Sequence, residues 1–372
     1  MRSWRFGLLT QLPSRPSTLE ASFDPPHPEE RRRRVSKEGA NEATNWTILR
    51  DGRLRLALPM RSLAFRAIPK LRPSKCLLAL FALVLCSSAA LAQDKGTLNP
   101  KPLPPLANPA DPRLPAKQVF GRVLTPVEAQ TRSIGFYSRG CLAGAKALPV
   151  DGQSWQVVRL SRNRMWGNPA MIAFLERFSR KAKAKGVWNG ILVGDISQPR
   201  GGPMLTGHAS HQIGLDADVW LTPMPNRTLS REERETMSAV DMVTEDGLSV
   251  TAQWTPAQAA IIKAAAEEPE VERIFVNAAI KKALCETAKG QPWMNKVRPY
   301  WGHNYHFHIR IKCPAGDSGC EPQDPVPPGD GCDKSLNWWF TDEALHPRPG
   351  PPKPPLPMAA LPPECRNVVL EK

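Results

Sequence analysis

The placement of proline limits how this 372-residue chain can fold more than any other feature. Of its 40 prolines, seven lie in residues 93–118 and seven more in the 11 residues 347–357, where the sequence reads PRPGPPKPPLP. Because proline lacks the backbone N–H and fixes φ, neither segment can supply a helix interior or a central strand. We therefore expect an extended linker at 93–118, one folded domain at about 119–345, and a polyproline-like tail at 346–372.

Inside this domain, the spacing of apolar residues is typical of helices in some segments and of strands in others. Apolar residues recur at helical spacing after Asn168-Pro169, after Thr255-Pro256 and over 278–287. Short apolar or alternating runs predict strands at 190–195, 215–220, 272–277 and 306–312. From Pro322 onward we expect only loops and turns. The mixture indicates an α+β fold, in which helices flank a central, mostly antiparallel sheet.

The N-terminal part carries the features of an export signal. Basic residues precede an apolar run at 76–86, and Ala90-Leu91-Ala92 forms a small-residue cleavage site before Gln93. The run is shorter than the roughly 20 residues of a membrane span, so we expect no stable membrane anchor. We predict that residues 60–92 are a signal peptide and that a periplasmic mature protein begins at Gln93. Residues 1–59 are interpreted as a mis-assigned start or a disordered extension, with a basic binding tail as the alternative.

The net charge of +15 first suggests an anionic partner such as nucleic acid. Residues 1–92, however, carry 16 Lys and Arg against 7 Asp and Glu, which leaves 34 against 28 in the remainder. Most of the excess lies in the segment that we expect to be removed. The mature protein is only mildly basic, and we expect no nucleic-acid partner.

Six cysteines follow the predicted cleavage site. They are Cys141, Cys285, Cys313, Cys320, Cys332 and Cys365. An even number in an exported chain indicates disulfide bonds. No C-x-x-C pair occurs, which argues against a zinc site built from thiolates.

Five of the seven histidines lie in two short stretches. They are His208 and His211, then His303, His306 and His308. On a strand, His306 and His308 share one face, so one can bind a metal while the other stands beside it. In the first stretch, His211 and Asp218 complement them, whereas Asp216 is expected either to support a ligand or to be a solvated acid. Two imidazoles and one carboxylate leave a coordination position open, as in catalytic zinc sites.

The stretches GHASHQIGLDADVW and HNYHFHIRIKCP resemble the penicillin-insensitive murein endopeptidases. That family belongs to a zinc superfamily with the lysostaphin-type and D-Ala-D-Ala metallopeptidases. The shared pattern is H-x6-D followed by H-x-H. The similarity continues through LPVDGQSWQVVRLSRNR at 148–164, VGDISQPRGGPM at 193–204 and RIFVNAAIKKALC at 273–285, and it covers roughly 135–365.

The resemblance implies that zinc is held by His211, Asp218 and His308. It further implies that His306 acts in catalysis with help from His303, and that His208 is an additional metal-associated residue. From the residues alone, a direct or only a supporting role for His208 and His303 stays open. The resemblance also makes Asp246 a candidate metal ligand, because a family D-G-x-H segment falls on 246–249. Ser249 replaces the histidine of that segment, which puts a second metal position in doubt. The implied disulfides are Cys141–Cys365, Cys285–Cys332 and Cys313–Cys320.

The implied reaction is hydrolysis of the D-alanyl–meso-diaminopimelyl cross-link in peptidoglycan, without an active-site serine. Two alternatives stay open. A zinc D,D-carboxypeptidase that trims stem peptides would share the zinc pattern and differ in the length of its groove. A non-catalytic, zinc-dependent wall-binding module is the other, and the retained His306 argues against it.

Overall fold

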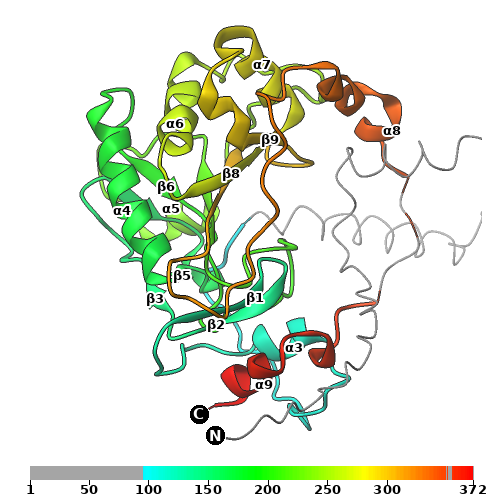
Figure 1. Cartoon of the computed structure of the whole chain (residues 1–372). Coiled ribbons are helices and arrows are strands. Elements are labelled where there is room, and N and C mark those ends of the chain that lie inside the picture. Colours follow the sequence, from blue (N-terminus) through cyan, green and yellow to red (C-terminus); the bar gives the residue numbers. More distant parts are fainter. Residues whose placement is uncertain (1–94, 349, 351–353, 372) are drawn as a thin grey trace, which may run out of the picture.

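The computed structural model describes residues 95–348, 350 and 354–371 (Figure 1). The predicted signal peptide, the predicted start at Gln93 and residues 1–59 lie outside the described residues. Helices and a mixed sheet make up the fold, which confirms the predicted α+β class. The sheet has six strands in the order β4-β6-β7-β10-β8-β9. They are β4 Trp155–Val157, β6 Ile191–Val193, β7 Asp216–Trp220, β8 Val271–Val276, β9 Val297–Pro299 and β10 His306–Ile311.

The three inner pairings of this sheet are antiparallel, and the two outer ones are parallel. The predicted mostly antiparallel sheet is therefore confirmed. Two small antiparallel pairs complete the strands. They are β1 Arg132–Phe136 with β2 Arg139–Ala143, and β3 Lys146–Ala147 with β5 Trp166–Gly167.

The three long helices form where the sequence predicts them. They are α4 Pro169–Ala184, α6 Pro256–Ala266 and α7 Ala278–Ala288. The side chain of Asn168 caps α4 by accepting a hydrogen bond from the Ala170 N–H (3.0 Å). Thr255 and Gln258 form a capping box at the start of α6. Both helices have proline at the first position, where the missing N–H needs no intrahelical partner.

Helices α4 and α6 cover the apolar face of the sheet (Figure 1). Phe307 on β10 meets Phe178 of α4 edge to face, with ring centroids 6.4 Å apart. Ile309 and Val219 belong to the same buried cluster. Because strand side chains alternate, this apolar packing leaves the polar residues of β7 and β10 on the opposite face.

The prediction that only loops and turns follow Pro322 is wrong. The region contains the 3₁₀ helices η4 Lys334–Phe340 and η5 Met358–Ala360, and the α-helices α8 Asp342–Leu345 and α9 Pro363–Leu370. Helix α9 begins with Pro363, a position where proline is favoured. Val368 and Val369 of this helix are buried, so apolar packing stabilises it. The remaining short helices are α3 Ala116–Phe120, η2 Leu160–Arg162, α5 Arg231–Thr236 and η3 Pro292–Lys296.

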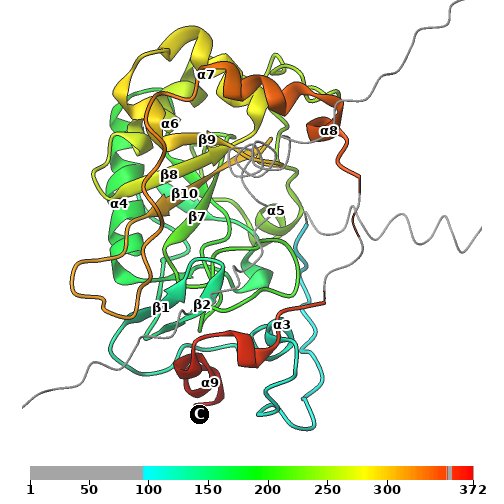
Figure 2. The same cartoon turned by 45° about the vertical axis from the view of Figure 1, so that its right-hand side comes forward.

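The two proline-rich ends of the domain pack against each other. Met358 N–H donates to the carbonyl of Leu114 (2.9 Å), and Ala116 N–H donates to that of Leu356 (2.8 Å). Helices α3 and α9 lie together at the same end of the molecule in both views (Figure 2). Their apolar side chains share a second buried cluster, which also contains Cys365. Within the described part of the chain, no helix is both long and apolar enough to cross a membrane.

All three implied disulfides are present. Their partners are 224 residues apart for Cys141–Cys365, 47 for Cys285–Cys332 and 7 for Cys313–Cys320. The first bond lies inside the second apolar cluster and ties α9 to β2. It therefore joins the C-terminal helix to the beginning of the domain.

We expect Cys365→Ser to lower the melting temperature by about 10 °C or more and to leave zinc binding by the folded protein intact. The chain-entropy model assigns a loop of this length about 5 kcal/mol, and about half of that to the short Cys313–Cys320 loop. Each kcal/mol shifts the melting temperature of a domain of this size by about 2–4 °C. Calorimetry of Cys365→Ser beside the control Cys320→Ser tests this. Equal melting temperatures for the two variants would contradict a tethering role.

Candidate metal centre

Strands β7 and β10 bring the acidic and basic residues of the site together. Their antiparallel register places Asp218 opposite His308, and Asp216 opposite Arg310. All four side chains are buried. The alternation predicted from LDADVW and HFHIRIK therefore builds one buried polar layer on the face away from α4 and α6.

The loop before β7 adds His211 to this layer through an unusual backbone conformation. His211 has φ of 67°, in the left-handed region that non-glycine residues avoid. Its N–H donates to Asp216 Oδ2 (3.0 Å), which holds the turn. Gly214 follows with φ of 72°, and a Cβ there would lie 2.5 Å from the Leu142 side chain. The loop between His211 and Asp218 consequently requires glycine at this position.

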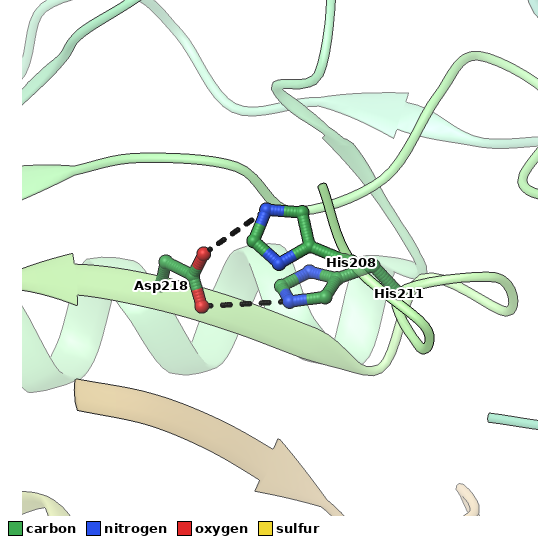
Figure 3. Close-up of side chains that lie close together, drawn as sticks. All are labelled: His208, His211 and Asp218. Atoms are coloured by element: carbon green, nitrogen blue, oxygen red, sulfur yellow. Dashed lines mark ion pairs between the residues drawn. The ribbon is translucent and has the colours of Figure 1, made fainter. Parts of the chain in front are cut away.

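Asp218 is the centre of a ring of histidines. Its Oδ1 lies 3.4 Å from His211 Nε2, 3.6 Å from His306 Nε2 and 3.6 Å from His308 Nδ1. Its Oδ2 lies 3.3 Å from His208 Nε2. Figure 3 shows the rings of His208 and His211 side by side, both directed at the carboxylate. Four of the five predicted histidines thus contact the predicted aspartate.

The hydrogen bonds of His211 and His308 define which ring nitrogen carries a proton. His211 Nδ1 lies 2.7 Å from the carbonyl oxygen of Ile196, which can only accept, so its Nε2 presents a lone pair. His308 Nε2 lies 2.8 Å from Asp216 Oδ1, so its Nδ1 presents a lone pair. Both lone pairs point toward Asp218 Oδ1.

This convergence of lone pairs fits a cation. His211 Nε2 and Asp218 Oδ1 are both buried and have no hydrogen-bond partner. Buried polar atoms rarely lack a hydrogen-bond partner, since each unpaired atom lowers the free energy of unfolding by about 1–3 kcal/mol. A metal ion accepts electron pairs from neutral imidazole and carboxylate, which is the donor set found here. Asp216 on the far nitrogen of His308 is the kind of partner that orients a metal-binding histidine.

The charge states agree with this donor set. Burial alone would raise the pKa of Asp218, but the surrounding histidines outweigh it and hold the pKa well below its usual value. Burial lowers the pKa of His308 to about 4 despite the nearby Asp216 carboxylate. Burial and the neighbouring imidazoles also keep the pKa of His303 well below its usual value. The centre therefore combines an ionised Asp218 with His303 and His308 in the neutral form. Burial lowers the pKa of His211, but the Asp218 carboxylate outweighs it and raises the pKa above its usual value, so an ion that binds here would displace a proton from His211.

His208 has a different set of contacts. It belongs with His211 and Asp218 to a group whose candidate ligand atoms lie within 4.8 Å of one another. Its Nε2, however, lies between two carboxylates, 3.0 Å from Asp195 Oδ2 and 3.3 Å from Asp218 Oδ2. A nitrogen between two acceptors carries its proton toward them. His208 is thus a candidate ligand by distance that also contacts a second carboxylate, and its metal-associated role stays a prediction.

His303 and His306 lie on the other side of Asp218. Their ring centroids are 4.9 Å apart. His303 has φ of 54°, and its Nδ1 lies 2.7 Å from the carbonyl oxygen of Trp301. His306 Nδ1 is buried without a hydrogen-bond partner. The two imidazoles form a contiguous pair beside the carboxylate, and their catalytic roles stay predictions.

Asp246 is not brought into this cluster. Its carboxylate is exposed and accepts hydrogen bonds from the Thr244 hydroxyl (2.6 Å) and the Leu248 N–H (3.0 Å). These bonds close its own turn. The metal-binding role predicted for Asp246 stays a prediction.

Sequence reasoning missed a charged group next to the histidines. Asp195 is buried and accepts from Arg162 Nη1 (3.1 Å) and Arg164 Nη1 (2.8 Å), besides its contact with His208. Burial would raise its pKa, but the bond from His208 and the two guanidinium groups lower it. The sequence signal is an aspartate at the end of the predicted strand 190–195, and that strand prediction gives Asp195 no further role.

Comparisons with known proteins give one consistent result. The family model described as "Penicillin-insensitive murein endopeptidase" matches residues 133–370. A protein of that name from Haemophilus influenzae is 45% identical over 245 residues, which are 63% of this chain and 80% of the relative. One from Klebsiella pneumoniae is 41% identical over 67% of this chain and 90% of the relative, and one from Yersinia enterocolitica is 40% identical over 67% and 89%.

We expect Asp216→Asn to weaken zinc affinity by about 10–100-fold, the usual effect of removing a partner that orients a metal-binding histidine. The substitution keeps the side-chain size but removes the charge that fixes the proton on His308 Nε2. Competition with a chelating dye measures the affinity. Asp342→Asn, which changes an exposed carboxylate on α8, is the control. Equal affinities for the two variants would rule out the supporting role of Asp216.

Proposed function

Because the chain belongs to the family of penicillin-insensitive murein endopeptidases, we propose that it is a zinc-dependent enzyme that hydrolyses the D-alanyl–meso-diaminopimelyl cross-links of peptidoglycan. The family makes the chain a peptidoglycan hydrolase. The observation that supports zinc is that His211 Nε2 and His308 Nδ1 lie 3.4 and 3.6 Å from Asp218 Oδ1, a buried oxygen without a hydrogen-bond partner.

Zinc at this point would favour ionisation of a water molecule near neutral pH and polarise the scissile carbonyl. Residues of the chain orient the ligands of the ion. The rings of His211 and His308 are held in orientation by the Ile196 carbonyl and the Asp216 carboxylate, so both can bind an ion without a change of rotamer. The set leaves a position open for substrate, and no serine nucleophile is required.

We assign proton transfer to His306. Its Nε2 lies 3.6 Å from Asp218 Oδ1, and the residue lines the pocket beside the metal centre. A histidine in this place can hold a proton on Nε2 and deliver it to the leaving amine nitrogen. His303 packs against its ring and keeps it in place. The same imidazole, when protonated, stabilises the oxyanion that develops on the carbonyl.

The substrate also fixes where the protein acts. Peptidoglycan lies outside the cytoplasmic membrane, so we propose a periplasmic enzyme exported by the signal peptide at 60–92. The three disulfide bonds agree with an oxidising compartment.

Digestion of purified sacculi tests the proposed reaction. The zinc-loaded protein should convert cross-linked muropeptide dimers into monomers without shortening their stem peptides. Monomers shortened by one D-alanine would instead identify a D,D-carboxypeptidase. Binding to sacculi without release of any muropeptide would identify a wall-binding module.

We expect His211→Ala, Asp218→Ala and His308→Ala each to lose zinc and activity together, because each removes one of three donors. Metal analysis of the purified variants measures the zinc content. The melting temperature of each variant shows whether it is folded. Full zinc occupancy in all three would contradict the ligand assignment.

We expect His306→Ala to keep its zinc and to lose turnover by about 10²–10⁴-fold, the usual contribution of a positioned acid or base. Zinc analysis and muropeptide release are measured on the same preparation. His346→Ala, an exposed histidine that pairs with Asp342 on α8, is the control. Turnover close to that of the control would show that His306 has only a structural role.

A further inference from the structure

A polar pocket adjoins the metal centre on the side of His208. It is lined by Arg159, Arg162, Gly194, Asp195, His208, Asp218, Trp220, Tyr305 and His306. The pocket therefore shares Asp218 and His306 with the proposed catalytic machinery. A group bound in it would lie directly beside the reacting bond.

The charged side chains that line this pocket balance one another, with Arg159 and Arg162 against Asp195 and Asp218. Arg164 does not line the pocket but contacts Asp195 through Nη1 (2.8 Å). A divalent ion on Asp218 would therefore make the pocket positive. A concave site with a net positive charge attracts an anionic group.

The three arginines have different positions. Arg159 is only 2% exposed, donates to the carbonyls of Arg234 and Met237, and stacks over Trp220. Arg164 does not line the pocket, and its Nη2 donates to the carbonyl of Thr206. The side chain of Arg162 lines the pocket and is 23% exposed.

Asp195 sets the direction of the Arg162 guanidinium. Arg162 Nη1 lies 3.1 Å from Asp195 Oδ2, and Asp195 is itself fixed by Arg164 and His208. Arg162 ends the 3₁₀ helix η2, whose flanking residues Arg159 and Asn163 both have positive φ. The Arg162 guanidinium is thus held at the pocket wall by a folded turn and by its ion pair with Asp195.

The chemistry of the proposed substrate supplies a matching anion. In the D-alanyl–meso-diaminopimelyl bond, the carbon that bears the scissile nitrogen also bears a carboxylate. Since His306 is assigned to the leaving nitrogen and lines the same pocket, that carboxylate is directed toward it. We propose that Arg162 binds this carboxylate and makes it a specificity determinant of the enzyme. The inference rests on the proposed function.

Two purified muropeptide dimers test the assignment, one with this carboxylate free and one with it converted to the carboxamide. The zinc-loaded parent should cleave the free form about 10–100-fold more efficiently, the value of a hydrogen bond to a charged group. Arg162→Gln should abolish most of this preference by raising KM for the free form. Binding of the cleaved product, with either group, is measured by calorimetry as a readout that does not need turnover.

Arg164→Gln is the matched control, because it also removes a partner of Asp195 but does not line the pocket. It should lower cleavage of both dimers alike and keep the preference. Equal cleavage of both dimers by the parent would overturn the assignment, as would a preference that survives in Arg162→Gln. If that variant does not fold, Arg162→Lys is used, and it should weaken the preference. A parent that cleaves neither dimer would contradict the proposed function, whereas product binding would still test Arg162.

Discussion

The antiparallel pairing of β7 with β10 fixes the position of almost every group in the metal centre. The register opposes Asp218 to His308, and Asp216 to Arg310. A shift by one residue would turn the carboxylates and imidazoles into the apolar layer under α4, because strand side chains alternate between faces. The apolar side of the same strands prevents such a shift, since Phe307 and Ile309 are buried there.

The buried carboxylate of Asp216 is compensated by hydrogen-bond donors from both strands and from the loop before β7. A carboxylate without partners would be costly in such a place. Its oxygens accept from His308 Nε2, Arg310 Nε and the His211 N–H. The guanidinium of Arg310 and the imidazole of His308 outweigh burial, and the pKa of Asp216 lies below its usual value. One side chain thus connects both strands and the loop that carries His211.

Strain is concentrated at the same place. Among the described residues, the non-glycine residues with positive φ are Arg159, Asn163, His211 and His303. Each such conformation costs about 1–3 kcal/mol and persists only where neighbouring contacts enforce it. For His303 those contacts are the bond from its Nδ1 to Trp301 and the bond from the Asn277 N–H to its carbonyl. The backbone is bent where two imidazoles must be aimed, which is typical of a functional site.

Much of this architecture could be predicted, and the reasons for the failures are physical. The strands at 215–220 and 306–312 have strong two-residue periods, so their faces and the pairing of Asp218 with the histidines followed. Helix α9 was missed because proline dominates the composition before it, although Pro363 suits a first helical position. The left-handed backbone at His211 and His303 does not follow from the sequence because neither residue is glycine, although Gly302, with φ of 65°, directly precedes His303. Asp195 and Arg162 are far apart in the chain, and their ion pair forms only when folding brings them together.

The polar pocket that adjoins the metal centre also bears on the difference between an endopeptidase and a carboxypeptidase. In a terminal D-alanyl-D-alanine, the carbon that bears the scissile nitrogen carries a carboxylate as well. A guanidinium at this point therefore serves both reactions equally. What differs is the rest of that residue, which is a methyl group in alanine and a long chain leading to a second peptide in diaminopimelate. Selection between the reactions must then come from the space beyond the carboxylate.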